Sequence, residues 1–184
     1  MMIAAELIEA GYKVFGLNGI LPSGLCACGW DLCQAPGKHP LASNWQHTPN
    51  WSDEQLETLV EMGQFASGYG VLVDGLLVID VDARNGGMKS YAKLLDAVPE
   101  IASAGMIVET GSGGGSKHLY FALSESAALV QGLPDYPGID FKSSGFVVGP
   151  GSLHSSGRHY QTAVGSAYDI TQAPAELLAL LRRT

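Results

Sequence analysis

The stretch Leu76–Arg84, LLVIDVDAR, decides the predicted fold of this chain. It is typical of a buried strand over residues 76–82 that ends in two carboxylates, Asp80 and Asp82. Residues two apart on a strand share one face, roughly 6.5–7 Å from each other. Two such carboxylates repel each other unless a cation lies between them, and Mg²⁺ or Mn²⁺ prefers oxygen ligands. The stretch therefore predicts a divalent-metal site, the alternative being a strand that ends in solvent with two surface acids.

Helical and strand patterns alternate along the rest of the chain. They predict an α+β fold with a mixed, largely antiparallel sheet or sheets flanked by helices. The dipeptide Asp74-Gly75 separates the strand at 76–82 from an expected strand at 69–73, a pattern typical of a β-hairpin. Ser52 and Gln55 form a capping-box pattern that predicts the start of a helix.

Length and composition predict a single domain over residues 1–184, with 46% apolar residues to build a core. The formal net charge of −8 argues against a protein that coats DNA non-specifically. The sequence has no run of 18 apolar residues, and its start lacks the basic region and cleavage site of a signal peptide. We therefore expect a cytoplasmic protein with no membrane contact.

A loop within residues 22–40 carries all three cysteines of the chain. With one histidine they follow the spacing C-x-C-x4-C-x5-H, as Cys26, Cys28, Cys33 and His39. Three thiolates and one imidazole complete a tetrahedral structural Zn²⁺ site, and such a site stabilises a loop that has no core of its own. The alternative is a loop with three reduced cysteines and an ordinary histidine.

A glycine-rich turn, Thr110–Ser116, precedes an expected strand at 117–123 that carries His118. The backbone N–H groups of such a turn, at Gly113 and Gly114 among others, suit a phosphate group. The turn does not match a Walker A loop or a dinucleotide-binding fingerprint, because its motif differs and a strand follows it instead of a helix. The alternatives are a flexible hairpin loop and an ordinary half-buried histidine.

A third cluster lies on an expected strand at Gly138–Lys142, where Asp140 and Lys142 share one face. Together with Asp80 and Asp82, the Asp140 carboxylate gives three acids, enough to hold two divalent cations. Lys142 and His118 would add hydrogen-bond donors for the outer oxygens of a triphosphate.

In this order the motifs resemble those of the bifunctional primase/polymerase (Prim-Pol) catalytic domain of the archaeo-eukaryotic primase superfamily, which is common in phages and plasmids. The opening AAELIEAGYKVFGL is similar to the first helix and strand of that family, and GKHP at 37–40 is similar to its lysine-proline element. The three motifs that carry the resemblance are VIDVD (78–82), TGSGGGSKHLYF (110–121) and GIDFKSSGFVVGPGSLH (138–154).

The resemblance implies an archaeo-eukaryotic primase-like fold with an RRM-like catalytic core and a zinc-binding loop. It implies that Asp80, Asp82 and Asp140 bind catalytic Mg²⁺ or Mn²⁺. It also implies that Ser116 and His118 lie at the nucleotide phosphates and that Lys142 neutralises the triphosphate. The implied partners are a single-stranded DNA template with its primer, nucleoside triphosphates, and a helicase domain or helicase protein.

The predicted activity is DNA primase or DNA polymerase activity, in which nucleotides are added to a primer 3′-hydroxyl by a two-metal mechanism during replication of a phage or plasmid-type replicon. Two alternatives stay open. A metal-dependent nuclease or phosphodiesterase would use the same carboxylates with water as the nucleophile. The other is a non-catalytic, zinc-stabilised nucleic-acid-binding module. Its low basic content counts against it, because the chain has only ten Lys and Arg residues in total.

Overall fold

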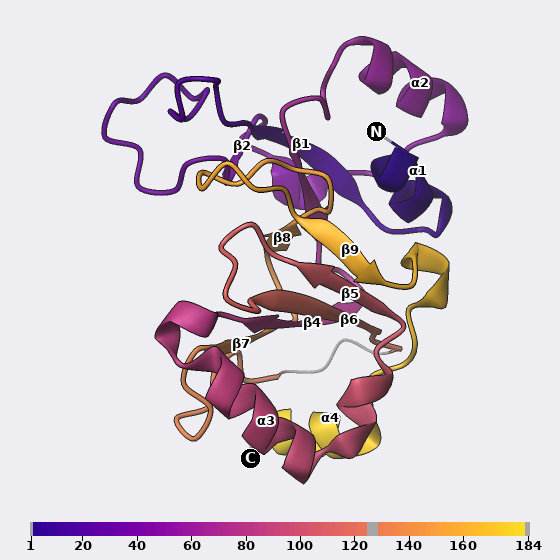
Figure 1. The fold of residues 1–184 in the computed structure, drawn as a ribbon. Coiled ribbons are helices and arrows are strands. Elements are labelled where there is room, and N and C mark those ends of the chain that lie inside the picture. The colour runs from indigo at the N-terminus through magenta and orange to yellow at the C-terminus, as the bar shows by residue number, and fades with distance from the viewer. Residues whose placement is uncertain (1, 125–128, 183–184) are drawn as a thin grey trace.

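The computed structural model describes residues 2–124 and 129–182 and has the predicted α+β architecture (Figure 1). The helices are α1 (Met2–Glu9), α2 (Asp53–Glu61), α3 (Gly87–Ala97) and α4 (Ala175–Leu181). The strands are β1 (Val14–Asn18), β2 (His39–Pro40), β3 (Tyr69–Leu72), β4 (Leu76–Val81), β5 (Met106–Glu109), β6 (Lys117–Ala122), β7 (Ile139–Lys142), β8 (Phe146–Val148) and β9 (Gln161–Val164). Short 3₁₀ helices occupy Trp45–His47, Ala83–Asn85, Pro99–Ser103 and Ala167–Asp169.

The strands form two antiparallel sheets. One has the order β2-β1-β3-β8 and the other has the order β7-β4-β6-β5-β9. In Figure 1 the four-stranded sheet lies in the upper half with α1 and α2, the five-stranded sheet crosses the middle, and α3 and α4 lie below it. The long loop before β2 extends from the upper half, away from the helices (Figure 1).

Two hydrophobic cores lie on opposite faces of the five-stranded sheet. The core between the sheets includes Val14, Leu17, Val71, Leu76, Val78, Val108, Tyr120 and Val147. The core against α3 and α4 includes Leu77, Ile79, Val81, Leu94, Leu119, Phe121, Phe141, Leu177 and Leu181. Strand β4 contributes to both cores in strict alternation, which is why its sequence is apolar almost throughout. The period that directs Leu76 and Val78 into the first core places Asp80 on the same face, at the end of the strand.

The prediction that Asp74-Gly75 makes a β-hairpin is wrong, because β3 and β4 belong to different sheets. Strand β4 pairs with β6 and β7, while β3 pairs with β1 and β8, so neither strand has an edge left for the other. The chain crosses between the sheets at Asp74-Gly75, and it crosses again between β7 and β8 at Gly145. The two crossings touch, since the Val73 N–H donates to the Gly145 carbonyl at 3.1 Å.

The capping box at the start of α2 is confirmed. The Gln55 backbone N–H donates to Ser52 Oγ, and the Ser52 backbone N–H donates to Gln55 Oε1. Within the described ranges, none of the helices combines the length and the apolar character that crossing a bilayer requires.

Candidate functional site

The strand register brings three of the predicted site residues side by side. Asp80 on β4 is directly opposite His118 on β6, and on its other edge it is directly opposite Asp140 on β7. Directly opposed residues of antiparallel strands have Cβ atoms about 4.5–5.5 Å apart. The acids that are 60 positions apart in the chain are therefore neighbours on one face of the five-stranded sheet, and Lys142 follows two residues further along that face.

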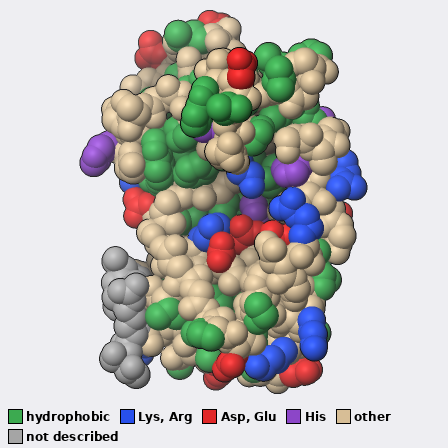
Figure 2. Space-filling model, turned by 90° about the vertical axis from the view of Figure 1, so that its left-hand side faces the viewer, with side chains coloured by type: hydrophobic (Ala, Val, Ile, Leu, Met, Phe, Trp, Pro, Cys, Tyr) green, Lys and Arg blue, Asp and Glu red, His purple; other side chains and the backbone are tan. Residues whose placement is uncertain are grey.

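These residues line a cleft of about 440 Å³ at the C-terminal end of β4, beside the start of the antiparallel strand β7. Its walls include Lys38, Asp80, Asp82, Arg84, Thr110, Ser112, Ser116, His118, Asp140, Lys142, His154 and Tyr160. Figure 2 looks onto this side of the molecule and shows acidic, basic and histidine side chains gathered at mid-height. The lining is polar and contains both charges, so it suits a charged ligand better than an apolar one.

Asp82 lies just beyond β4, which ends one residue earlier than predicted. It caps the 3₁₀ helix at 83–85: Oδ1 accepts the Arg84 backbone N–H at 3.0 Å, and Oδ2 accepts from Asn85 Nδ2 at 2.8 Å. Arg84 also forms an ion pair with Asp82, with Nε and Oδ1 3.3 Å apart. Asp82 thus lines the same cleft as Asp80, but its carboxylate is positioned by a turn, whereas that of Asp80 is positioned by a strand.

The charges around Asp80 favour its ionised form. Burial raises the pKa of Asp80, but His118, Lys142 and Lys38 lower it by more, so its pKa lies below the usual value. His118 Nε2 is 3.5 Å from Asp80 Oδ1. The other ring nitrogen, His118 Nδ1, is buried without a hydrogen-bond partner among the described residues. Asp80 is therefore an anion that faces a second acid across the β4–β7 ladder.

Asp140 is the most exposed acid of the cleft, with 65% of its side chain accessible against 28% for Asp80. Lys142 Nζ is 3.4 Å from Asp140 Oδ2. Carboxylates directly opposite each other destabilise a sheet, and the neighbouring cations offset part of that cost. An arrangement of oxygen ligands that repel one another fits hard divalent cations.

His154 and Tyr160 line the wall of the cleft that comes from the C-terminal part of the chain. Burial, together with the positive charges of Lys38, Arg84 and Arg158, lowers the pKa of His154. Burial raises the pKa of Tyr160, and the Asp80 charge adds to that effect. Tyr160 is therefore a neutral phenol at physiological pH, buried in the wall of the cleft. The sequence alone did not place Lys38 or Tyr160 in the cleft. Lys38 lies within GKHP, the element similar to the family's lysine-proline element, and that resemblance was the available signal, whereas the local pattern around Tyr160 carries none.

The glycine-rich turn forms one rim of the cleft and is held from two sides. On one side the Ala83 N–H donates to Ser116 Oγ at 2.9 Å. On the other side Arg158 donates to the carbonyls of Gly111 and Ser112, at 3.0 and 2.8 Å. Arg158 and Ser116 thus tie the turn to two different parts of the chain.

Gly113 and Gly114 lie behind this rim. In the described part of the chain they line a neighbouring cavity of about 440 Å³, together with Arg158 and Gln161, and they are not among the residues that line the carboxylate cleft. Gly113 has a φ of 74°, and a Cβ atom there would meet Arg158 Nη2 at 2.4 Å. A side chain at this position would strain the left-handed backbone and would displace the Arg158 guanidinium.

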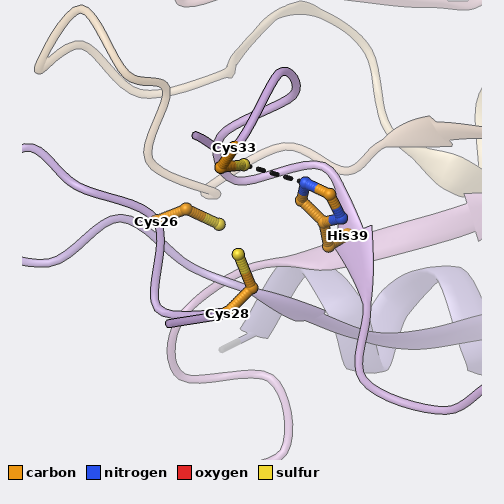
Figure 3. A group of neighbouring side chains, drawn as sticks. All are labelled: Cys26, Cys28, Cys33 and His39. Carbon is orange, nitrogen blue, oxygen red and sulfur yellow. Dashed lines mark hydrogen bonds between the residues drawn. The ribbon is translucent and has the colours of Figure 1, made fainter. Parts of the chain in front are cut away.

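The four predicted zinc ligands converge, three from the loop before β2 and His39 from the start of β2 itself (Figure 3). One ligand atom from each of Cys26, Cys28, Cys33 and His39 lies within 4.8 Å of all the others. Over residues 2–124 and 129–182, this is the one group of three or more His, Cys, Asp or Glu side chains that meets this criterion. Cys33 Sγ and His39 Nε2 are 2.9 Å apart. This donor set fits a tetrahedral zinc ion with no position left for a substrate.

The three aspartates do not meet the same criterion within the described residues. Their carboxylates share the cleft, but each also has a partner on the protein: His118 for Asp80, Arg84 for Asp82 and Lys142 for Asp140. A cation that binds at this cleft would therefore replace these protein partners of the carboxylates.

The order of the motifs and this geometry agree with a comparison against protein families. A model of the bifunctional DNA primase/polymerase N-terminal domain matches residues 4–177, nearly the whole chain. The chain belongs to this family. Membership in the DNA primase/polymerase family indicates a DNA-directed nucleotidyltransferase that acts on DNA and nucleotides, and enzymes of this family generally use divalent metals. No curated protein matches the chain.

The primase/polymerase match includes the cleft and the cysteine loop together. All twelve predicted site residues lie inside its bounds, from Cys26 in the loop to Lys142 on β7.

Proposed function

We propose that this chain is a template-directed nucleotidyltransferase that adds nucleotides to a primer 3′-hydroxyl by a two-metal mechanism. The observation that carries the proposal is the register of β6, β4 and β7, in which His118, Asp80 and Asp140 are adjacent on one face. Asp82 completes a set of three carboxylates in the cleft. In this proposal residues 1–184 form one catalytic domain.

Asp80, Asp82 and Asp140 would hold Mg²⁺ or Mn²⁺. Bound cations would lower the pKa of the attacking 3′-hydroxyl and stabilise the pyrophosphate leaving group. The 3′-oxygen forms a bond to the α-phosphorus while the bond to the β-phosphate bridging oxygen breaks, and the hydroxyl proton passes to solvent. The low pKa of Asp80 keeps this ligand ionised through the neutral range.

The remaining residues of the cleft would bind and orient the triphosphate. Lys142 supplies a cation next to Asp140, and His118 a ring nitrogen next to Asp80. Ser116 would stabilise the phosphates from the rim. Gly113 and Gly114 line the neighbouring cavity instead, and the Gly113 N–H donates to the Thr110 carbonyl at 3.1 Å, so we leave these two glycines out of the proposed phosphate site. Positioning and electrostatic stabilisation supply most of the acceleration in reactions of this kind.

A structural zinc ion would be held by Cys26, Cys28, Cys33 and His39, and its binding free energy would stabilise the loop at 22–40. By resemblance, the setting is the replication of a phage or plasmid-type replicon, with a single-stranded DNA template, a primer and a helicase domain or protein as partners. No step of the chemistry depends on the zinc ion.

Primer extension tests the proposal. Asp80→Asn and Asp140→Asn should each lower the rate of nucleotide incorporation at least about a hundredfold, because each removes a metal ligand and its charge. Asp135→Asn is the matched control, since Asp135 is exposed and outside the cleft. Its incorporation rate should not change. Wild-type rates in either cleft variant would refute the assignment.

The same preparation separates polymerase from nuclease activity. Labelled single-stranded DNA is incubated with Mn²⁺, with and without nucleoside triphosphates. We expect extension that requires nucleotides and a paired primer. Shortening of the strand that is independent of nucleotides, and that is lost in Asp80→Asn, would instead identify a phosphodiesterase.

A further inference from the structure

Lys38 is the cleft cation that does not come from the five-stranded sheet or its turns. It lies in the cysteine loop, directly before His39, and its side chain lines the cleft with Asp80 and Asp140. The positive charge of Lys38 contributes to lowering the pKa of Asp80 and the pKa of His154. The loop that carries the zinc-type donors therefore also forms part of the proposed catalytic cleft.

The other cations of the cleft are already paired. Arg84 forms an ion pair with Asp82, and Lys142 with Asp140. Among the residues that the structure describes, no carboxylate lies within 4.0 Å of Lys38 Nζ. Lys38 is exposed, so its ammonium group can bind a phosphate oxygen without first breaking an ion pair.

The backbone on both sides of Lys38 is attached to the Cys–His group. Before it, the Gly37 N–H donates to Cys26 Sγ at 3.5 Å, and Gly37 has a left-handed φ of 76°. After it, His39 is itself one of the four donors and pairs with Asn18 of β1. The conformation of the four donors thus fixes the two residues that flank Lys38.

Apolar packing contributes little to the order of this loop, which otherwise has a few backbone hydrogen bonds. Leu21, Leu25, Trp30 and Leu32 are all exposed, from 44% to 70%, instead of forming a core. In the same segment the Cys26 side chain is buried. A loop with so little apolar burial depends on a bound metal for a single conformation.

We infer that Lys38 binds the phosphate chain of the incoming nucleotide, and that metal binding by Cys26, Cys28, Cys33 and His39 holds Lys38 in position to do so. This inference rests on the proposed nucleotidyltransferase function. It makes the cysteine loop a part of the substrate site, in which metal occupancy sets nucleotide affinity.

Nucleotide binding without turnover tests the inference. A fluorescent nucleoside triphosphate is titrated in the presence of Ca²⁺, and zinc content is measured on the same samples by mass spectrometry. Lys38→Ala should raise Kd roughly tenfold, the size expected for loss of one charged hydrogen bond, and should keep its zinc. Lys89→Ala is the control, because Lys89 is exposed on α3 outside the cleft, and its Kd should not change.

The link to the metal is tested by a double-mutant cycle. Cys33→Ser should lose zinc and raise Kd to a similar extent, and the variant with both substitutions should bind no more weakly than either single variant. If Cys33→Ser does not fold, Gly37→Ala replaces it: it leaves all four donors intact but forces a strained backbone next to Lys38, so Kd should again rise.

Three results would overturn the inference: wild-type protein without zinc, an unchanged Kd in Lys38→Ala, or additive effects in the cycle. An Asp80→Asn arm separates this failure from failure of the proposed function. If the wild-type protein binds the nucleotide and Asp80→Asn weakens binding, the nucleotide site stands even where Lys38 has no effect. If the wild-type protein binds no nucleotide, the proposed function fails as well.

Discussion

At the scale of single residues, the cleft combines groups that an ordinary protein surface keeps apart. Asp80 and Asp140 are directly opposed across two strands, an arrangement that costs free energy unless cations offset it. The offset comes from His118, Lys142 and Lys38, which come from three separate segments of the chain. Such opposed charges are typical of a site built for a ligand.

The alternation of residues in LLVIDVDAR was enough to predict a buried strand that carries Asp80 near its end. It was not enough to predict the neighbours of Asp80, because the register with β6 and β7 depends on turns and cores far away in the sequence. The proximity of Lys38 did not follow from local pattern for the same reason, since the loop at 22–40 has no periodic pattern that would fix its direction.

Substituting Lys142 tests the electrostatics of the triphosphate site. Lys142→Ala should raise KM for the nucleotide about tenfold and leave kcat within a few-fold of wild type, because the charge acts mainly on binding. Lys142→Arg keeps the charge and should restore most of the affinity. Steady-state primer extension gives both constants. An unchanged KM would mean that Lys142 serves only to neutralise Asp140.

The pH dependence of stability tests the environment of His154. Because its pKa is lowered in the fold, the folded protein binds this proton less readily than the unfolded chain. Above the unfolded pKa of about 6.5, His154 is neutral in both states and does not lower the stability. As the pH falls from there toward the lower folded pKa, the unfolded chain takes up the proton first, and the folded protein loses stability. His154→Gln should therefore lose less stability than wild type between about pH 7 and pH 5 in urea unfolding. Parallel curves for the two proteins would contradict this.

At the scale of elements, the strands and their faces followed from local sequence, but their assignment to sheets did not. Asp74-Gly75 does reverse the chain, as its residue types require. The reversal leads into a second sheet because both edges of β4 are occupied by β6 and β7. By contrast, the capping box at Ser52 was predictable because all of its partners lie within four residues.

The glycine-rich turn depends on a clamp from a distant element. Arg158 donates to two of the turn's carbonyls, at Gly111 and Ser112. Arg158→Ala should raise the hydrogen-exchange rate of the amides of residues 111–116 about tenfold and lower kcat/KM by a similar factor, mainly through KM.

Arg158→Lys is the matched variant for this clamp, because it keeps the charge but cannot donate to both carbonyls in the same way. It should behave like Arg158→Ala if the hydrogen bonds hold the turn, and like wild type if only the positive charge matters. Unchanged exchange in Arg158→Ala would show that Ser116 and the backbone hold the turn without the guanidinium.

At the scale of the whole molecule, a net charge of −8 limits how the chain holds DNA. Three cations, Lys38, Arg84 and Lys142, line the cleft. Three phosphate contacts on a single strand correspond to a slope of log K against log salt of about −2, which is shallow for a DNA-binding protein. Fluorescence anisotropy with labelled single-stranded DNA across a salt series measures this slope. A slope steeper than about −5 would reveal a larger basic surface than this cleft provides.

Anomalous diffraction at the manganese edge, from crystals grown with Mn²⁺, a primed template and a non-hydrolysable nucleoside triphosphate, tests whether the cleft carboxylates bind the catalytic metals. We predict manganese peaks within coordination distance of the Asp80 and Asp140 carboxylates, with the triphosphate reaching toward Lys142. Bound nucleotide with manganese away from both carboxylates would contradict the account.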